Sequence, residues 1–293
     1  MSLVEVQRLG LGTAQFGMDY GISNLTGRAS DAEMTAILTR CRDAGISTLD
    51  TAALYDDAEK RIGDMLPDDW SPRIVTKTAH LAEGLAGVEQ AFLASLERLG
   101  RESIYGLQVH RAGDLLGDEG PDLWRLLERL REEGRVEKIG VSVYSAEQTD
   151  SLLGSYPLEI VQFPASILDQ RLVHDGTVGR LKKAGIEIHV RSIFLQGLLF
   201  LTSDQLPSEL AFARTTLERV HACLMEAGIT PLEAALAYVL QRPEFDIVLV
   251  GVTTQGELDA ILNAALSPQP DLDWNCFALE DEHILNPAQW MAQ

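Results

Sequence analysis

The sequence predicts an α/β fold, a single (β/α)8 TIM barrel over residues 1–293. Short runs of apolar and β-branched residues alternate with longer helical stretches along almost the whole chain. The runs are apolar at most positions, as in parallel strands that are buried on both faces. No linker-like segment interrupts the alternation, and barrels of this kind commonly reach about 250 residues as one domain. The alternative is an open, doubly wound parallel sheet.

The elements follow in a regular order. Eight short runs with high strand propensity predict strands over residues 9–13, 47–51, 73–78, 104–110, 138–143, 160–164, 187–194 and 247–252. Stretches with interleaved apolar and charged residues predict helices over residues 31–44, 56–66, 81–99, 122–133, 146–155, 177–184, 208–227 and 254–265. The leucine- and alanine-rich residues 231–240 are expected to belong to the core.

Local signals mark where these helices begin and end. Ser30 and Glu33 have the spacing of a capping box at the start of the 31–44 helix. Glycine is expected to end helices in the left-handed conformation. It stands at such points at positions 45, 100, 134, 185 and 228.

Composition limits the class of protein. Apolar residues make up 46% of the chain, enough for a large core, and the formal net charge is −20. That charge disfavours nucleic acid or an anionic membrane as a partner. The three cysteines lack disulfide or metal spacing, and neither a signal peptide nor an eighteen-residue apolar span is evident. We therefore expect a cytoplasmic protein without a metal site that acts on a small molecule.

The glycine-rich segment 10–17 does not have the G-x-G-x-x-G spacing of an open-sheet dinucleotide site, and no Walker loop is present. Any dinucleotide site is therefore expected at the carboxyl ends of barrel strands and in the loops that follow them.

Four residues at or just after three predicted strands have the side chains that acid-assisted carbonyl reduction needs: Asp50, Tyr55, Lys77 and His110. Tyrosine in water has a pKa near 10, so it donates a proton at neutral pH only if a nearby cation favours the phenolate. A lysine held by an aspartate can supply that cation, and a histidine can hold the carbonyl oxygen. Each residue alone also has an ordinary structural explanation, but barrels build active sites at these strand ends.

The local sequences resemble the aldo-keto reductase superfamily. The matching motifs are spread in order over residues 10–17, 43–55, 59–63, 76–77, 108–110 and 134–142, and the resemblance extends to about residue 265. It implies a (β/α)8 barrel that reduces aldehydes or ketones, or oxidises the alcohols, with NADP or NAD. It also implies a monomer more often than an oligomer. By the same resemblance, Tyr55 would be the general acid, Lys77 paired with Asp50 would favour its ionisation, and His110 would orient the carbonyl.

The resemblance also implies coenzyme contacts, with departures. Ser142 and Gln162 would bind the nicotinamide carboxamide, but Val143 stands where asparagine usually follows the serine. Arg191 takes the place of a common stacking aromatic residue, and a guanidinium plane can also stack. The loop residues Ser192, Leu195 and Gly197 would lie near the pyrophosphate.

The last strand departs further from the family pattern. Members that prefer NADP carry Lys or Arg just after it, whereas Gly251, Thr253 and Glu257 offer no cation here. A carboxylate suits a free ribose 2′-hydroxyl. The absence of a cation after the last strand favours NAD, whereas the general pattern of the family favours NADP. The preferred form of the coenzyme therefore stays open.

Substrate contacts in this fold come from loops beyond the strands. The candidates are Phe16, Tyr20, Leu54, His80, Arg111, Tyr144 and Phe194. His80 and Arg111 next to the candidate catalytic positions suggest a polar or anionic substrate. The C-terminal tail, residues 271–290, is expected near the barrel mouth, either folded over it or packed on its side.

Two other classes of function remain. One is a dinucleotide-binding, redox-linked regulatory protein with little turnover, which the departures at Val143, Arg191 and Glu257 allow. The other, an open-sheet dehydrogenase or metal-dependent enzyme, is disfavoured because neither a glycine fingerprint nor metal-ligand spacing is present.

Overall fold

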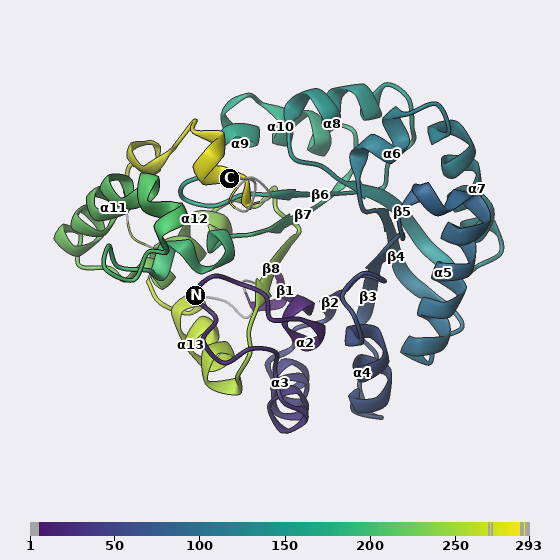
Figure 1. Cartoon of the computed structure of the whole chain (residues 1–293), viewed down its shortest axis with the longest axis horizontal. Coiled ribbons are helices and arrows are strands. Elements are labelled where there is room, and N and C mark those ends of the chain that lie inside the picture. Colours follow the sequence, from purple (N-terminus) through teal and green to yellow (C-terminus); the bar gives the residue numbers. More distant parts are fainter. Residues whose placement is uncertain (1–5, 269, 271, 288–289, 291–293) are drawn as a thin grey trace.

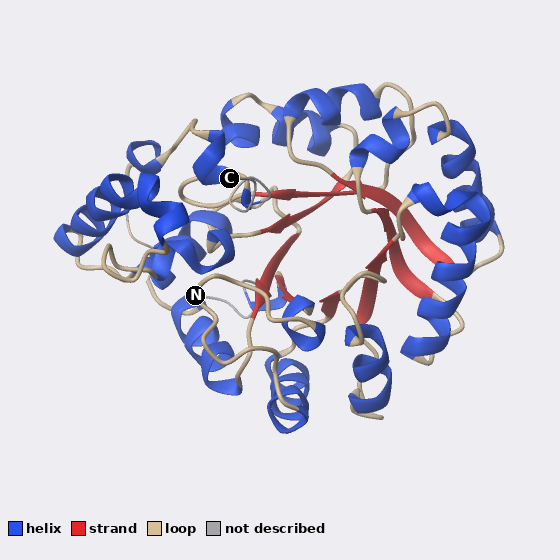
Figure 2. Ribbon diagram, in the orientation of Figure 1, coloured by secondary structure: helices blue, strands red, loops and turns tan. Residues whose placement is uncertain are grey.

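Eight parallel strands close into a barrel surrounded by helices (Figures 1 and 2). This computed structural model describes residues 6–268, 270, 272–287 and 290. Each strand pairs with its neighbours in chain order, and the first strand pairs with both the second and the eighth. The predicted (β/α)8 barrel is therefore confirmed, and the open sheet is excluded because no strand edge remains unpaired within the described barrel.

The strands agree with the prediction to within a few residues. They are β1 (Leu9–Gly12), β2 (Thr48–Asp50), β3 (Arg73–Lys77), β4 (Ile104–Val109), β5 (Val136–Ser142), β6 (Ile160–Pro164), β7 (Glu187–Arg191) and β8 (Ile247–Gly251). The largest difference is in β7, which was expected to continue to residue 194. It ends at Arg191 because Ser192 has a φ of 58°, a left-handed conformation that turns the chain out of the sheet.

The predicted helices are present, and some are divided or accompanied by short ones. The helices are α2 (Ala14–Gly17), α3 (Asp31–Ala44), α4 (Ala58–Met65), η1 (Leu81–Glu83), α5 (Gly84–Leu99), α6 (Ala112–Leu116), α7 (Gly120–Glu132), α8 (Ala146–Leu153), α9 (Arg171–His174), α10 (Thr177–Lys183), η2 (Leu195–Phe200), η3 (Ser208–Ala213), α11 (Arg214–Glu226), α12 (Pro231–Leu240), α13 (Gln255–Ala265), η4 (Trp274–Phe277) and α14 (Glu282–Leu285). The four-residue helices α2 and α9 are too short to produce a periodic sequence signal.

The start of α3 differs from the predicted capping box. Ser30 Oγ accepts a hydrogen bond from the Glu33 amide at 3.2 Å, as expected. The Glu33 carboxylate, however, accepts from the Gln255 amide at the start of α13, at 2.8 Å. Glu33 therefore links α3 to α13, 222 positions away in the chain. Gly45 and Gly100 end α3 and α5 with φ values of 79° and 62°, as predicted for glycine at these points.

The remaining large elements pack into the core as expected. In α12, residues 234–240 are all buried, which confirms that this segment belongs to the core. Among the described residues no single helix is long and apolar enough to cross a membrane. Two consecutive helical segments, Ser208–Glu226 and Pro231–Leu240, meet the length and composition criteria when taken together, but they are bent by 85° relative to each other.

The described part of the C-terminal tail packs against α12 and the segment that follows β6. The Trp274 ring lies edge-on to Tyr238, with ring centres 5.8 Å apart, and its Nε1 donates to Gln241. The Leu279 amide donates to the Leu168 carbonyl. Figure 1 shows this yellow segment beside α9 and α12. The described tail thus covers the barrel wall at the β6 end, and none of its residues lines the cavity described below.

A polar network crosses the amino end of the barrel. The Glu187 carboxylate accepts from Lys138 Nζ at 2.5 Å and from the Tyr105 hydroxyl at 2.6 Å, and its other oxygen lies 2.7 Å from His189 Nε2. Because β4 and β7 are not neighbours in the sheet, the contact between Tyr105 and Glu187 spans the barrel interior. Burial alone would raise the pKa of Glu187, but hydrogen bonds from His189, Lys138 and Tyr105 lower it to about 2.

Replacing this carboxylate should destabilise the barrel. We expect Glu187→Gln to lower the free energy of unfolding by about 1–3 kcal/mol, because charged hydrogen bonds to a largely buried acceptor are lost. Since the folded pKa lies below the ordinary value, the stabilisation is complete above about pH 4.5 and is lost as the pH falls towards 2. Urea unfolding at pH 7 and pH 3 measures both effects. Asp64→Asn, which breaks the exposed Lys60–Asp64 pair, is the control and should cost under about 0.5 kcal/mol.

Candidate active site

The four candidate catalytic residues meet at the carboxyl ends of three adjacent strands. Asp50 is the last residue of β2, Lys77 is the last residue of β3, and His110 directly follows β4. Tyr55 stands in the loop after β2, where the next residue, Asp56, has a φ of 47°. A left-handed conformation is costly for a residue other than glycine and often occurs at functional sites. Parallel neighbouring strands bring these side chains together.

Asp50 and Lys77 form a buried ion pair. Lys77 Nζ donates to Asp50 Oδ1 at 2.6 Å and to the Thr51 carbonyl at 3.0 Å, and the two charged side chains are 2% and 6% exposed. Gln162 Nε2 donates to the second Asp50 oxygen at 2.7 Å. Burial alone would lower the pKa of Lys77, but the Asp50 carboxylate and, to a smaller extent, Tyr55 together outweigh it, and the pKa is raised. Lys77 is therefore a permanent cation in this site.

Tyr55 and His110 lie next to this cation. Lys77 Nζ is 5.4 Å from the centre of the Tyr55 ring, and the Tyr55 and His110 rings are 6.3 Å apart in an edge-on arrangement. Burial, and then the Lys77 charge, lower the pKa of His110 to about 4. His110 is therefore neutral at pH 7. Its buried Nδ1 has no hydrogen-bond partner among the described residues.

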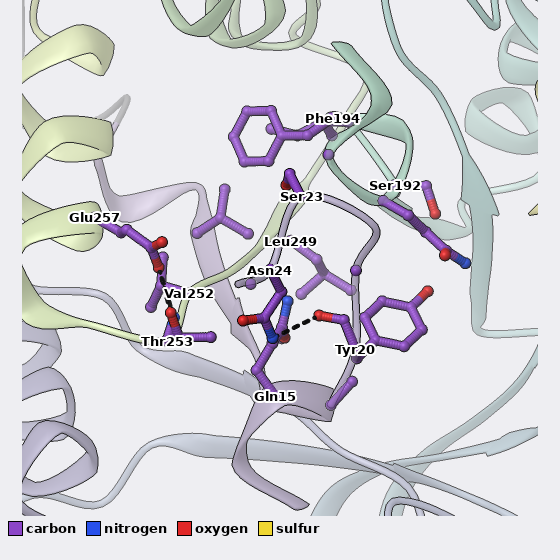
Figure 3. Close-up of a pocket in the computed structure, with 18 of the residues that line it drawn as sticks. Gln15, Tyr20, Ser23, Asn24, Ser192, Phe194, Leu249, Val252, Thr253 and Glu257 are labelled. Atoms are coloured by element: carbon purple, nitrogen blue, oxygen red, sulfur yellow. Dashed lines mark hydrogen bonds between the residues drawn. The ribbon is translucent and has the colours of Figure 1, made fainter. Parts of the chain in front are cut away.

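A cavity of about 350 Å³ opens beside Asp50 and Tyr55. It extends past the loop after β7, which includes Ser192 and Phe194, and reaches Thr253 and the first two turns of α13 (Figure 3). Figure 3 shows Glu257 and Thr253 on one side of it and Tyr20 and Ser192 on the other. A cavity that joins a buried ion pair to a helix start has room for an elongated ligand.

Part of the cavity wall comes from the loop after α2, through Tyr20, Gly21, Ser23 and Asn24, and the sequence indicated only Tyr20 among these residues. The Ile22 amide donates to the Gln196 carbonyl at 2.9 Å, so this loop is joined to the loop after β7. Burial raises the pKa of Tyr20 to about 12, and the nearby Tyr55 acts in the same direction. The only sequence signal for this loop is its turn chemistry, Gly21 and Gly27, which predicts a bend and not a partner.

The predicted coenzyme residues fall into two groups. Those that line the cavity are Arg191, Ser192, Gly197, Gly251, Thr253 and Glu257. Those that do not are Ser142, Gln162 and Leu195, all of them buried behind it. The side chain of Leu195 is in the core at 1% exposure, so only its backbone can face a ligand. The Gln162 amide oxygen is buried without a hydrogen-bond partner among the described residues.

Arg191 is a second cation at this end of the cavity. Its guanidinium lies 4.3 Å from the centre of the Tyr144 ring and makes only long contacts, 3.4 and 3.5 Å, with Ser192 and Ser142. Within the described residues no carboxylate pairs with Arg191, although its charge acts on Lys77 and His110. Arg191 thus adds positive potential close to Lys77 and His110.

The predicted substrate contacts also divide. Phe16 is fully buried in the core and does not line the cavity, and its contact with a substrate stays a prediction. Tyr20 and Phe194 line the cavity. Leu54, His80, Arg111 and Tyr144 lie outside the cavity lining, on the rim formed by the loops after β2 to β5.

Comparison with known proteins agrees with this geometry. The model of the Aldo/keto reductase family matches residues 8–276. The chain belongs to this family. A curated relative, Aldo-keto reductase YhdN of Bacillus subtilis (strain 168), is 23% identical over 88% of this chain and 85% of its own length. Family membership supports oxidoreductase chemistry on carbonyl compounds.

Solved structures of family members have the same fold. The holo form of aldo-keto reductase AKR11C1 from Bacillus halodurans superposes with a TM-score of 0.74 at 21% identity and covers 92% of this chain and 90% of that chain. Glycerol dehydrogenase AKR11B4 from Gluconobacter oxydans gives a TM-score of 0.69 at 20% identity, over 92% and 89% of the two chains.

The residues of the cavity fit a nicotinamide dinucleotide, the coenzyme of this family. Gln162 is buried beside Asp50, which lines the cavity, and its amide oxygen has no hydrogen-bond partner among the described residues, so that oxygen is free to accept from a carboxamide. At Gly251 a Cβ would lie 2.6 Å from the Gln15 side-chain amide, so glycine leaves space for that amide in the cavity wall. Ser192, Leu195 and Gln196 have φ values of 58°, 48° and 54°, and this left-handed run bends the loop around the cavity.

Proposed function

We propose that the protein reduces an aldehyde or ketone, or oxidises the corresponding alcohol, with a nicotinamide dinucleotide and with Tyr55 as the general acid or base. The observation that carries this proposal is the buried Asp50–Lys77 pair beside Tyr55 at the mouth of an elongated cavity. The coenzyme, when bound, supplies or accepts the hydride. The residues of the chain align the carbonyl group and donate or accept the proton.

Tyr55 would donate its phenolic proton to the carbonyl oxygen as negative charge grows there. Lys77, fixed by Asp50, would stabilise the phenolate that remains. Neutral His110 can donate one N–H to the same carbonyl oxygen without competing for the proton of Tyr55. Arg191 adds positive potential at the same end of the cavity. In alcohol oxidation the same groups act in reverse, and Tyr55 is the base.

The function is tested by oxidation of NADH and NADPH with a panel of activated aldehydes, ketones and sugars, and by reduction of NAD and NADP with polyols such as glycerol. The polyols are included because one structural neighbour is a glycerol dehydrogenase. Turnover in either direction supports the proposal. Coenzyme binding without turnover across the panel would contradict it and favour a regulatory protein.

His110 should remain neutral through the physiological pH range. Its pKa of about 4 reflects burial first and then Lys77, with Arg191 and His80 acting in the same direction and Asp50 opposing them. We therefore expect no loss of activity from protonation of this imidazole until the pH falls below about 5. Proton NMR of the histidines from pH 4 to 8 measures the titration, and His110→Gln identifies the signal. A titration of His110 near pH 6.5 would contradict the prediction.

A further inference from the structure

The far end of the cavity lies at the start of α13. A dinucleotide with its nicotinamide beside Tyr55 and its length along the cavity would bring its adenosine half near Thr253, Glu257 and Ala260, which line the cavity. The inference below therefore rests on the proposed function. It concerns the ribose 2′ position, which carries a hydroxyl in NAD and a phosphate in NADP.

Two carboxylates from different elements occupy the amino end of α13. Glu257 Oε2 accepts from the Thr253 amide at 2.7 Å, from the Thr254 amide at 3.3 Å and from the Thr253 hydroxyl at 3.1 Å. Glu33, which comes from α3, accepts from the Gln255 amide at 2.8 Å. The first amides of a helix usually remain available to donate to a bound anion. In α13 they are occupied by two carboxylates of the chain itself, which also place two negative charges there.

The cations near this end are already paired. Arg40 binds Asp259 of α13 at 2.6 Å, and Arg28, in the loop that approaches the cavity, binds Asp57 at 3.0 Å. Among the described residues that line the cavity, Arg191 is the only lysine or arginine, and it lies at the catalytic end. A 2′-phosphate, with a charge of about −1.5 to −2 at pH 7, would meet carboxylates and no free cation. A 2′-hydroxyl can instead donate to a carboxylate.

We propose that Glu33 and Glu257 together make the coenzyme site selective for NAD(H) over NADP(H). Glu257 lines the cavity and repels the 2′-phosphate. Glu33 does not line the cavity, but it occupies the Gln255 amide and adds a second negative charge at the start of α13. Glu33 is the specificity residue that the sequence pattern does not indicate, because it lies on α3, far from the last strand. The charges are partly exposed, so the selectivity decreases with ionic strength.

The test measures the dissociation constants of NADH and NADPH from the coenzyme fluorescence, at low salt and at about 0.5 M salt. We expect NADH to bind roughly tenfold or more tightly than NADPH at low salt, and the difference to narrow at high salt. Glu33→Gln and Glu257→Gln keep an amide oxygen that can still cap α13. Each should reduce the selectivity several-fold by strengthening NADPH binding, and the double variant should reduce it further.

Two controls isolate the effect. Glu132→Gln removes the same charge from the exposed end of α7, away from the cavity, and should leave the selectivity ratio unchanged. Thermal unfolding of each variant verifies that α13 remains capped. Equal affinity of the wild-type protein for the two coenzymes, or unchanged selectivity in the double variant, would overturn the assignment. If neither coenzyme binds, the proposed function itself fails, and this inference fails with it.

Discussion

Tyr55→Phe should lower the turnover of carbonyl reduction by roughly 10²–10⁴-fold, because the substitution removes the proton donor and leaves the ring in place. Lys77 and Asp50 remain paired in this variant, so the site keeps its charge and shape. The coenzyme dissociation constant should change by less than about twofold, since the lost hydroxyl acts on the substrate oxygen and not on coenzyme binding. Steady-state turnover and fluorescence titration of the same samples measure the two quantities.

Tyr144→Phe is the matched control. Tyr144 is 40% exposed and contacts Arg191 through its ring, which phenylalanine retains. The turnover of the Tyr144→Phe variant should stay within about threefold of the wild-type value. Comparable losses in the two variants would show that Tyr55 is not the acid. Turnover of Tyr55→Phe at the wild-type rate would exclude the mechanism altogether.

Breaking the Asp50–Lys77 pair should destabilise the fold as well as stop turnover. In Asp50→Asn the Lys77 charge remains buried without its carboxylate, and in Lys77→Met the Asp50 charge remains buried without its ammonium. We expect each single variant to lose about 3–5 kcal/mol of unfolding free energy, because removing one member of a buried pair leaves the other uncompensated. In Asp50→Asn the main group that opposes burial is lost and only Tyr55 still raises the pKa of Lys77, so that pKa falls.

The double variant measures the interaction energy of the Asp50–Lys77 pair apart from the other contacts of each residue. Asp50→Asn with Lys77→Met removes both charges, and its cost should be smaller than the sum of the single costs by at least about 1 kcal/mol. Urea unfolding of the four proteins at pH 7 gives this coupling energy. Additive costs would mean that the Asp50 hydrogen bond to Gln162, and not the ion pair, carries the stability.

The sequence predicts the barrel well because its signals are local. A β-branched run, a helix with an apolar stripe and a glycine such as Gly45 at the helix end depend on neighbours in the chain. The gathering of Asp50, Lys77 and His110 also follows from topology alone, since the carboxyl ends of consecutive parallel strands meet at one face of a barrel. These residues could therefore be placed together before any coordinates were known.

The rest depends on contacts between distant segments. Phe16 is a candidate contact by position, but a four-residue helix, α2, turns it into the core. The Glu33 carboxylate satisfies the spacing of a local capping box and instead caps α13. His189 had no sequence signal, yet it belongs to the network around Glu187 inside the barrel. In each case tertiary packing selects a partner that local propensity cannot indicate.

The contact between Gly197 and Ser23 limits how this protein can evolve. A Cβ at position 197 would lie 1.8 Å from the Ser23 hydroxyl, and the φ of 91° at Gly197 is itself unfavourable for other residues. A mutation at position 197 therefore displaces the loop that carries Ser23 and disturbs the cavity wall in one step. Descendants of this sequence can diversify the rim residues Leu54 and Arg111 one at a time, whereas the two loops that meet at Gly197 must change together. Changes at the rim thus need fewer compensating mutations than changes where these two loops meet.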